Sequence, residues 1–235
     1  MLVQFSLAKV KEFIFDLLFP KKCVSCQREG DFFCHKCQQK INFIQTQSCP
    51  FCNRISPLGR FCERCQRKYK MALSGILVAA HLEDPLREAI HTYKYQFVKE
   101  LSYSLSQILI STLRKNLPHK APILIPTPLH RRRKAWRGFN QAELLADLVG
   151  CEFGLPVLKR SLLRIKNTYP QIELKRQERK ENVKGAFFYQ GKDLKKETIL
   201  LIDDVATTGA TLNECAKELK KAGARAIWGV VLGRD

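Results

Sequence analysis

An acidic pair between an apolar run and a loop of small residues constrains this chain more than any other feature. Residues 199–202 are all apolar, Asp203 and Asp204 follow them, and small residues, mostly threonine, alanine and glycine, fill the loop beyond. Apolar residues then return at helical spacing from Leu212 onward. This pattern predicts a buried strand, a tight loop and an amphipathic helix.

The loop after the acidic pair has the features of an anion site. Backbone N–H groups and the positive end of the following helix meet there, and threonine hydroxyls add donors. Asp203 and Asp204 would repel a bare phosphate, but a ligand with both a phosphate and a vicinal diol suits both halves, because the diol donates to the carboxylates. Phosphoribosyl pyrophosphate is such a ligand. The loop residues expected to bind it are Ala206, Thr207, Thr208, Gly209, Ala210 and Thr211.

Asp203 and Asp204 are the candidate catalytic residues if the chain is an enzyme. Magnesium would bridge the pyrophosphate and the ribose hydroxyls, and arginines together with the metal would stabilise the departing pyrophosphate. The ionised carboxylate pair would favour the positive charge that develops on the ring carbon. A nitrogen nucleophile would then attack, and no base-recognition motif identifies that acceptor.

Most of the cysteines lie in one short block. Eight of the ten form four Cys-x-x-Cys pairs between residues 23 and 65. Without a secretion signal, such pairs favour structural zinc over disulfides, and two pairs complete a closed tetrahedral site. Sequential pairing would make two small zinc ribbons, and the sequence leaves open a pairing across the block. The expected ligands are Cys23, Cys26, Cys34, Cys37, Cys49, Cys52, Cys62 and Cys65.

The end of the cysteine block predicts a domain boundary. Residues 1–70 would hold an N-terminal helix, over Leu7 to Phe19, and the zinc ribbons, and residues 71–235 a larger domain. Strands alternate with helices in the larger part, which indicates an α/β fold with a parallel sheet. Strands are predicted at 73–80, 122–126, 187–189, 198–202 and 225–232, and helices at 138–150 and from 84 to 117 with a break near 95.

No segment reaches the ~18 continuous apolar residues of a membrane-spanning helix. The N-terminus also lacks the pattern of a signal peptide. We therefore expect a cytoplasmic protein.

A dense basic loop is predicted after the strand at 122–126. The carboxyl ends of parallel strands meet at one edge of a sheet, so this loop would lie beside the acidic pair. The net charge of +19 favours phosphates as partners, in a nucleotide or in a nucleic acid, with a merely solvated basic surface as the alternative. Trp136 would either stack on a base or pack inside the protein. The nucleic-acid candidates in this loop are Arg131, Arg132, Arg133, Lys134, Trp136 and Arg137.

A further polar segment, residues 164–184, is too long for a simple connection. Its length and polarity are those of a hood that closes over a reacting centre and excludes water. Arg176 and Arg179 would then approach the pyrophosphate. The alternative is a basic ribbon that contacts DNA without closing, so the same two arginines are also nucleic-acid candidates.

Residues 200–212 resemble the phosphoribosyl-pyrophosphate loop of type I phosphoribosyltransferases. In that loop an apolar strand leads into two acids, two variable residues and then Thr-Thr/Ser-Gly. The resemblance implies a type I phosphoribosyltransferase-like domain. It also implies that the start of the basic loop holds the pyrophosphate, through Thr127, Pro128, Arg131 and Arg132.

The order of motifs along nearly the whole chain resembles the ComF family of competence proteins, which join a cysteine-knuckle domain to a phosphoribosyltransferase-like domain. The resemblance is carried by the segments Pro126-Thr-Pro-Leu-His130, Arg137-Gly-Phe-Asn-Gln141 and Gly185-Ala-Phe187 beside the cysteine pairs and the acidic loop. It implies a role in natural transformation, namely the handling of single-stranded DNA at the inner face of the membrane after uptake. A competence helicase or other DNA-processing proteins would be partners.

Two functions of different classes follow. The first is a cytoplasmic DNA-handling protein with a ligand-binding phosphoribosyltransferase-like domain. The second is an active phosphoribosyltransferase that acts on a nucleobase or another nitrogen acceptor. Both predict phosphoribosyl pyrophosphate binding, and they differ in whether the chain binds single-stranded DNA. A third option is a regulator that uses the fold only to sense the ligand.

Overall fold

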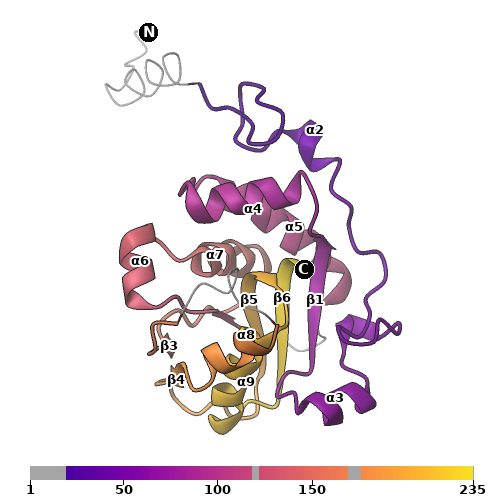
Figure 1. Ribbon diagram of the computed structural model, residues 1–235, viewed down its shortest axis with the longest axis vertical. Helices are drawn as coiled ribbons and strands as arrows, with labels where there is room; N and C mark the ends of the chain where they lie inside the picture. The colour runs from indigo at the N-terminus through magenta and orange to yellow at the C-terminus, as the bar shows by residue number, and fades with distance from the viewer. Residues whose placement is uncertain (1–19, 118–121, 169–175, 235) are drawn as a thin grey trace.

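The computed structural model describes residues 20–117, 122–168 and 176–234, and the helix predicted over Leu7 to Phe19 lies outside them. Figure 1 shows a central sheet with helices on its two faces. The elements are α2 His35–Gln38, η1 Pro57–Gly59, α3 Glu63–Tyr69, β1 Gly75–His81, α4 Leu86–Tyr95, α5 Leu101–Asn116, β2 Ile123–Pro126, α6 Arg131–Arg137, α7 Gln141–Phe153, β3 Leu162–Arg164, α8 Arg176–Val183, β4 Phe187–Tyr189, β5 Thr198–Ala206, α9 Ala210–Lys221 and β6 Ala226–Arg234.

The central sheet has four parallel strands in the order β1-β6-β5-β2. This confirms the parallel α/β sheet expected from the alternation of strands and helices. The strand predicted to end at Ile202 is longer, because β5 continues to pair with β6 as far as Ala206. Asp203 and Asp204 therefore belong to strand β5 and not to the loop, and pairing of β5 with β6 fixes their backbone.

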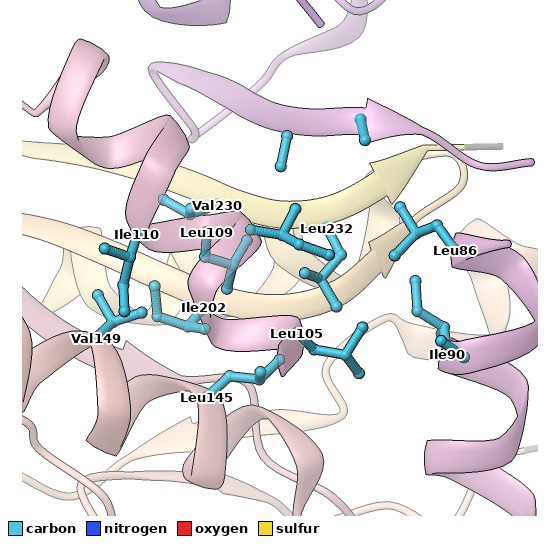
Figure 2. Close-up of a cluster of buried hydrophobic side chains, with 14 of the residues drawn as sticks. Leu86, Ile90, Leu105, Leu109, Ile110, Leu145, Val149, Ile202, Val230 and Leu232 are labelled. Atoms are coloured by element: carbon cyan, nitrogen blue, oxygen red, sulfur yellow. The ribbon is translucent and has the colours of Figure 1, made fainter. Parts of the chain in front are cut away.

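The two faces of the sheet build separate cores, because successive residues of a strand point to opposite sides. On one face Leu200 and Ile202 belong to a core with side chains of α4, α5 and α7, and Figure 2 shows Ile202 beside those of α5 and α7. On the other face Ile199 and Leu201 pack against α9 and against β3 and β4. Such burial on both faces explains the unbroken apolar run that precedes the acids.

The strand predicted at 187–189 is present as β4, but it does not join the parallel sheet. It pairs with β3 in a separate antiparallel ribbon, with Leu162 opposite Tyr189 and Arg164 opposite Phe187. This ribbon frames the segment for which a hood was predicted. Three residues per strand are too few to complete a buried sheet, and the ribbon instead lies against α9.

The basic segment predicted as a loop is a short helix, α6. His130 caps its first turn, because the Nδ1 atom accepts a hydrogen bond from the backbone N–H of Arg132 at 3.4 Å. Gly138 ends the helix with a φ of 77°, a conformation that glycine adopts without strain. The cap and the glycine stop explain why seven residues with five positive charges are helical.

The cysteine block lies along the edge of the sheet that β1 forms. Figure 1 shows α2 and α3 near opposite ends of β1, with the connecting segment beside that strand. The backbone N–H of Ile44 donates to the carbonyl of Ala79 at 3.0 Å, and the Gln47 amide donates to the Val78 carbonyl at 2.9 Å. The segment therefore covers β1, which would otherwise be an unpaired edge strand.

Candidate functional site

The acidic pair and the first residues after β2 open onto one cavity of about 440 Å³. It lies where the carboxyl ends of β2 and β5 meet, as the topology of a parallel sheet requires. Of the residues predicted to bind a ligand, the structure brings six together along its walls. These are Asp203, Asp204, Thr207, Thr211, Thr127 and Pro128.

The remaining loop residues lie behind the cavity wall. Ala206 and Thr208 are buried, and the Thr208 hydroxyl accepts a hydrogen bond from the backbone N–H of Ala210 at 3.3 Å. Gly209 has a φ of 72°, which only glycine adopts readily, and α9 begins at the next residue. Thr207 and Thr211 line the cavity, so the start of α9 lies at its wall, as an anion site at a helix N-terminus requires.

The two acids are not equivalent. Asp204 is paired with Lys94 of α4, whose Nζ lies 2.7 Å from the Oδ1 atom of Asp204. Burial, together with the neighbouring charge of Asp204, raises the pKa of Asp203 from 3.8 to about 7. In the ligand-free protein at neutral pH, Asp203 is therefore protonated in a substantial fraction of the molecules.

Arginines form the cavity wall that faces the acids. Arg133 and Arg137 of α6 and Arg164 of β3 all line it. Burial, followed by repulsion from Arg133, lowers the pKa of Arg164 to about 10, so this side chain stays charged at neutral pH. Arg133 donates to the Thr168 carbonyl at 2.7 Å, which ties α6 to the base of the predicted hood.

Four buried polar atoms in the described part of the chain lack a hydrogen-bond partner, and all four belong to residues of this cavity. They are Thr127 Oγ1, Arg137 Nε, Gln141 Nε2 and Arg164 Nε. Three of them are N–H donors, and the fourth is a hydroxyl that can donate. Buried donors are nearly always satisfied, and acceptor oxygens of a ligand in this cavity would satisfy these four atoms.

The predicted nucleic-acid residues divide between two sides of α6. Arg133 and Arg137 line the cavity, whereas Arg131, Arg132 and Trp136 are exposed and do not. Lys134 is also exposed and pairs with Glu143 at 2.8 Å. Arg176 and Arg179 lie on α8, and their side chains are outside the described part of the structure.

Three further residues of the cavity, Lys94, Tyr95 and Arg164, were not among the predicted site residues. Lys94 had a signal, because it continues the row Leu86–Ile90 at four-residue spacing and so places a charge on the buried side of α4. A lysine there needs a partner, and Asp204 supplies it. Arg137 lies over the Tyr95 ring, 5.6 Å from its centroid. No local pattern predicts that Arg164 reaches the same cavity.

The eight cysteines of the Cys-x-x-Cys pairs form two clusters, in the sequential pairing. Within each cluster the four sulfur atoms lie within 4.8 Å of one another. The Cys26 and Cys34 sulfurs are 3.6 Å apart, and those of Cys52 and Cys62 are 3.7 Å apart. A tetrahedral zinc with bonds of about 2.3 Å requires sulfur separations of about 3.8 Å. Both clusters therefore fit a structural zinc ion.

The raised pKa of Asp203 predicts stability that falls as pH rises. Between about pH 4 and pH 7 the folded state holds a proton that the unfolded state has released, so folding is favoured at the lower pH. We expect the free energy of unfolding of the wild type, relative to Asp203→Asn, to fall by about 1 kcal/mol per pH unit between pH 5 and 7. Urea denaturation of both proteins measures this, and parallel pH profiles would contradict it.

Comparison with known proteins agrees with this structure. A double zinc ribbon domain matches residues 14–66. Competence protein F of Haemophilus influenzae is 30% identical over 90% of this chain and 97% of its own. Competence protein ComFC of Bacillus subtilis is 28% identical over 81% of this chain and 78% of its own. The DNA utilization protein YhgH of Escherichia coli K12 is 28% identical over 83% of this chain and 86% of its own.

Solved phosphoribosyltransferases are similar to part of the chain. Adenine phosphoribosyltransferase from Leishmania tarentolae is 17% identical, covers 61% of this chain and 75% of its own, and has a TM-score of 0.39. A purine phosphoribosyltransferase from Pyrococcus horikoshii is 18% identical, covers 57% and 82%, and has a TM-score of 0.36. Scores this low carry no weight beside the sheet order and the acidic loop.

The sheet and its cavity, with the cysteine clusters before them, define a phosphoribosyltransferase-like α/β domain preceded by a double zinc ribbon. Within this class, the 30% identity to Competence protein F over 97% of that protein's length indicates the family. The chain belongs to the ComF family of competence proteins. None of the helices that the structure describes is long and apolar enough to span a membrane.

Proposed function

We propose that the cavity binds phosphoribosyl pyrophosphate, and that the protein uses this domain in handling single-stranded DNA during natural transformation. The observation that carries the first part is the set of unpaired donors opposite the acidic pair. Phosphate oxygens accept from the donors, and ribose hydroxyls donate to carboxylates. Ribonucleotides and sugar phosphates carry both groups, and phosphoribosyl pyrophosphate adds a pyrophosphate for the cavity arginines.

In this proposal each part of the ligand has a partner among the residues of the cavity. The two carboxylates would accept hydrogen bonds from the ribose diol, and the loop before α9 would hold the 5′-phosphate. Thr127 and Pro128, with the cavity arginines Arg133, Arg137 and Arg164, would hold the pyrophosphate. Arg131 and Arg132 were predicted for this role, and they lie outside the cavity wall.

Magnesium would enter with the pyrophosphate. Lys94 already lies 2.7 Å from Asp204, so this carboxylate has a cationic partner without a metal. The metal would supply charge neutralisation on the pyrophosphate oxygens. Of the residues of this chain, Asp203 and Asp204 would be the closest to this metal. They would act on it through the ribose hydroxyls, from which their carboxylates would accept hydrogen bonds.

The DNA part of the proposal is supported by the names of the relatives and by the charge of α6. Relatives are called competence proteins and DNA utilization proteins. The outer side of α6 presents Arg131 and Arg132 to solvent on a chain with a net charge of +19. Such a surface binds phosphates of a nucleic acid with a strong salt dependence. In this proposal the protein works in the cytoplasm, at the inner face of the membrane, beside a competence helicase or other DNA-processing proteins.

Reversal of two charges on α6 is expected to weaken DNA binding without affecting the cavity. The double variant Arg131→Glu/Arg132→Glu should lower affinity for an oligonucleotide at least tenfold at low salt. It should also reduce the slope of log affinity against log salt concentration by about two, one for each lost phosphate contact. Fluorescence anisotropy with a labelled single strand over a salt series measures both. Lys217→Glu on α9 is the control, since Lys217 forms an ion pair with its neighbour Glu214 on that helix and does not line the cavity. Equal losses in both proteins would contradict the assignment to α6.

A further inference from the structure

Two exposed aromatic side chains meet beside the basic surface of α6. Trp136 is 64% exposed and Phe97, in the connection after α4, is 36% exposed. Their ring centroids are 5.0 Å apart and the rings are nearly perpendicular, at 87°. Large aromatic side chains normally pack inside a protein. Here two of them, from distant parts of the sequence, are held together while much of their surface faces water.

The backbone at Phe97 is held in an unfavourable conformation. Its φ is 61°, and it is the one aromatic residue among the non-glycine residues with positive φ that the structure describes. Phe97 directly follows Gln96, the C-cap of α4, where a left-handed residue commonly ends a helix, and glycine is the usual residue there. For a bulky residue this conformation is rare, and it fixes the direction in which the Phe97 side chain leaves the end of α4.

Positive charges surround the pair. Arg132 lies one turn before Trp136 on α6, so both side chains share one side of the helix. Arg131 is exposed beside it, and Lys99 follows Phe97 by two residues, with its Nζ atom 5.5 Å from the Phe139 ring centroid. Exposed rings among cations are the pattern by which proteins hold single strands, since bases stack on the rings and phosphates bind the cations.

We propose that Phe97 and Trp136 form a stacking platform for an unpaired base of a single DNA strand. This inference rests on the proposed DNA-handling function and names the side chains that contact bases. A duplex does not fit, because its base faces are covered by neighbouring base pairs. Stacking is also insensitive to sequence, since every base has a flat face.

Leucine substitutions separate base contacts from phosphate contacts. Trp136→Leu and Phe97→Leu keep an apolar side chain and remove the ring. Each is expected to lower affinity for a thymidine oligonucleotide about tenfold and to leave affinity for an abasic strand of the same length nearly unchanged. Trp136→Phe should recover most of the loss. Tyr103→Leu is the matched control, because Tyr103 is an exposed aromatic residue on α5, also 64% exposed.

Intrinsic fluorescence gives a second readout from the wild-type protein. The only other tryptophan, Trp228, is 5% exposed, so quenching by an added strand reports Trp136. We expect the thymidine strand to quench more than the abasic strand. Unchanged affinity in both leucine variants, with loss in the Arg131→Glu/Arg132→Glu variant, would overturn the platform and keep the DNA function. A wild type that binds no single strand at low salt would overturn both.

Discussion

Replacement of one cysteine in either cluster is expected to release one zinc ion and uncover the edge of the sheet. Elemental analysis should give two zinc ions per chain for the wild type and one each for Cys23→Ser and Cys49→Ser, because every cluster needs four thiolates. Structural zinc contributes on the order of 10 kcal/mol to the folding of small zinc domains. We therefore expect loss of a zinc ligand to destabilise its surroundings more than any other single substitution in the chain.

The consequence should extend to the phosphoribosyltransferase-like domain. The segment between the clusters pairs with β1 through Ile44 and Gln47, so a loosened segment exposes an unpaired strand. We expect both variants to aggregate on warming at temperatures where the wild type stays monodisperse, as light scattering would show. Cys151→Ser is the control, since Cys151 is exposed and outside both clusters. Two zinc ions in either cluster variant would contradict the assignment.

The second large effect is expected at the acidic pair. The double variant Asp203→Asn/Asp204→Asn keeps the shape of the cavity and removes both carboxylates. These carboxylates would accept the hydrogen bonds of the ribose diol. A hydrogen bond to a charged group contributes about 1.5–3 kcal/mol, so loss of two should weaken phosphoribosyl pyrophosphate binding more than 100-fold. Isothermal titration calorimetry in the presence of magnesium measures this.

Its matched control is Asp147→Asn. Asp147 forms an ion pair with Lys159 at 2.8 Å, at a partly exposed position away from the cavity lining. This variant should bind the ligand as the wild type does. If the double variant at the acidic pair binds within threefold of the wild type, the diol is not held by these carboxylates and the orientation proposed for the ligand is wrong.

Local chemistry explains which parts of the site could be predicted from the sequence. The four cysteine pairs carry their spacing within a few residues, and the structure confirms two four-cysteine clusters. The strand, the two acids and the glycine turn before α9 are likewise contiguous. The alternation of elements was sufficient for the parallel sheet, because a parallel connection needs a crossover of helix length.

The missed features depend on contacts between distant segments. Lys94 and Arg164 approach the acids only because α4 and β3 fold over the ends of the strands. The length of β5 beyond Ile202 depends on β6 as its partner. The pairing of β3 with β4 joins residues about 25 apart, and three-residue strands leave little periodicity to detect.

The two sides of α6 would contact the two proposed ligands separately. Arg133 and Arg137 face the cavity, and Arg131, Arg132 and Trp136 face solvent. In the proposed function, this single short helix would offer one side to a small phosphorylated ligand and the other to a nucleic acid. Charge reversal on the outer side and amide substitution of the acids should separate the two activities.

The most direct test of the cavity assignment compares two sugar phosphates that differ by one hydroxyl. Zinc-loaded wild-type protein would be titrated by calorimetry with ribose 5-phosphate and with 2-deoxyribose 5-phosphate, beside phosphoribosyl pyrophosphate with magnesium. We expect phosphoribosyl pyrophosphate to bind most tightly, and the deoxy sugar about tenfold more weakly than ribose 5-phosphate, because one hydroxyl to the acidic pair is lost. Equal affinity for the two sugar phosphates, or no binding of phosphoribosyl pyrophosphate, would contradict a phosphoribosyl site.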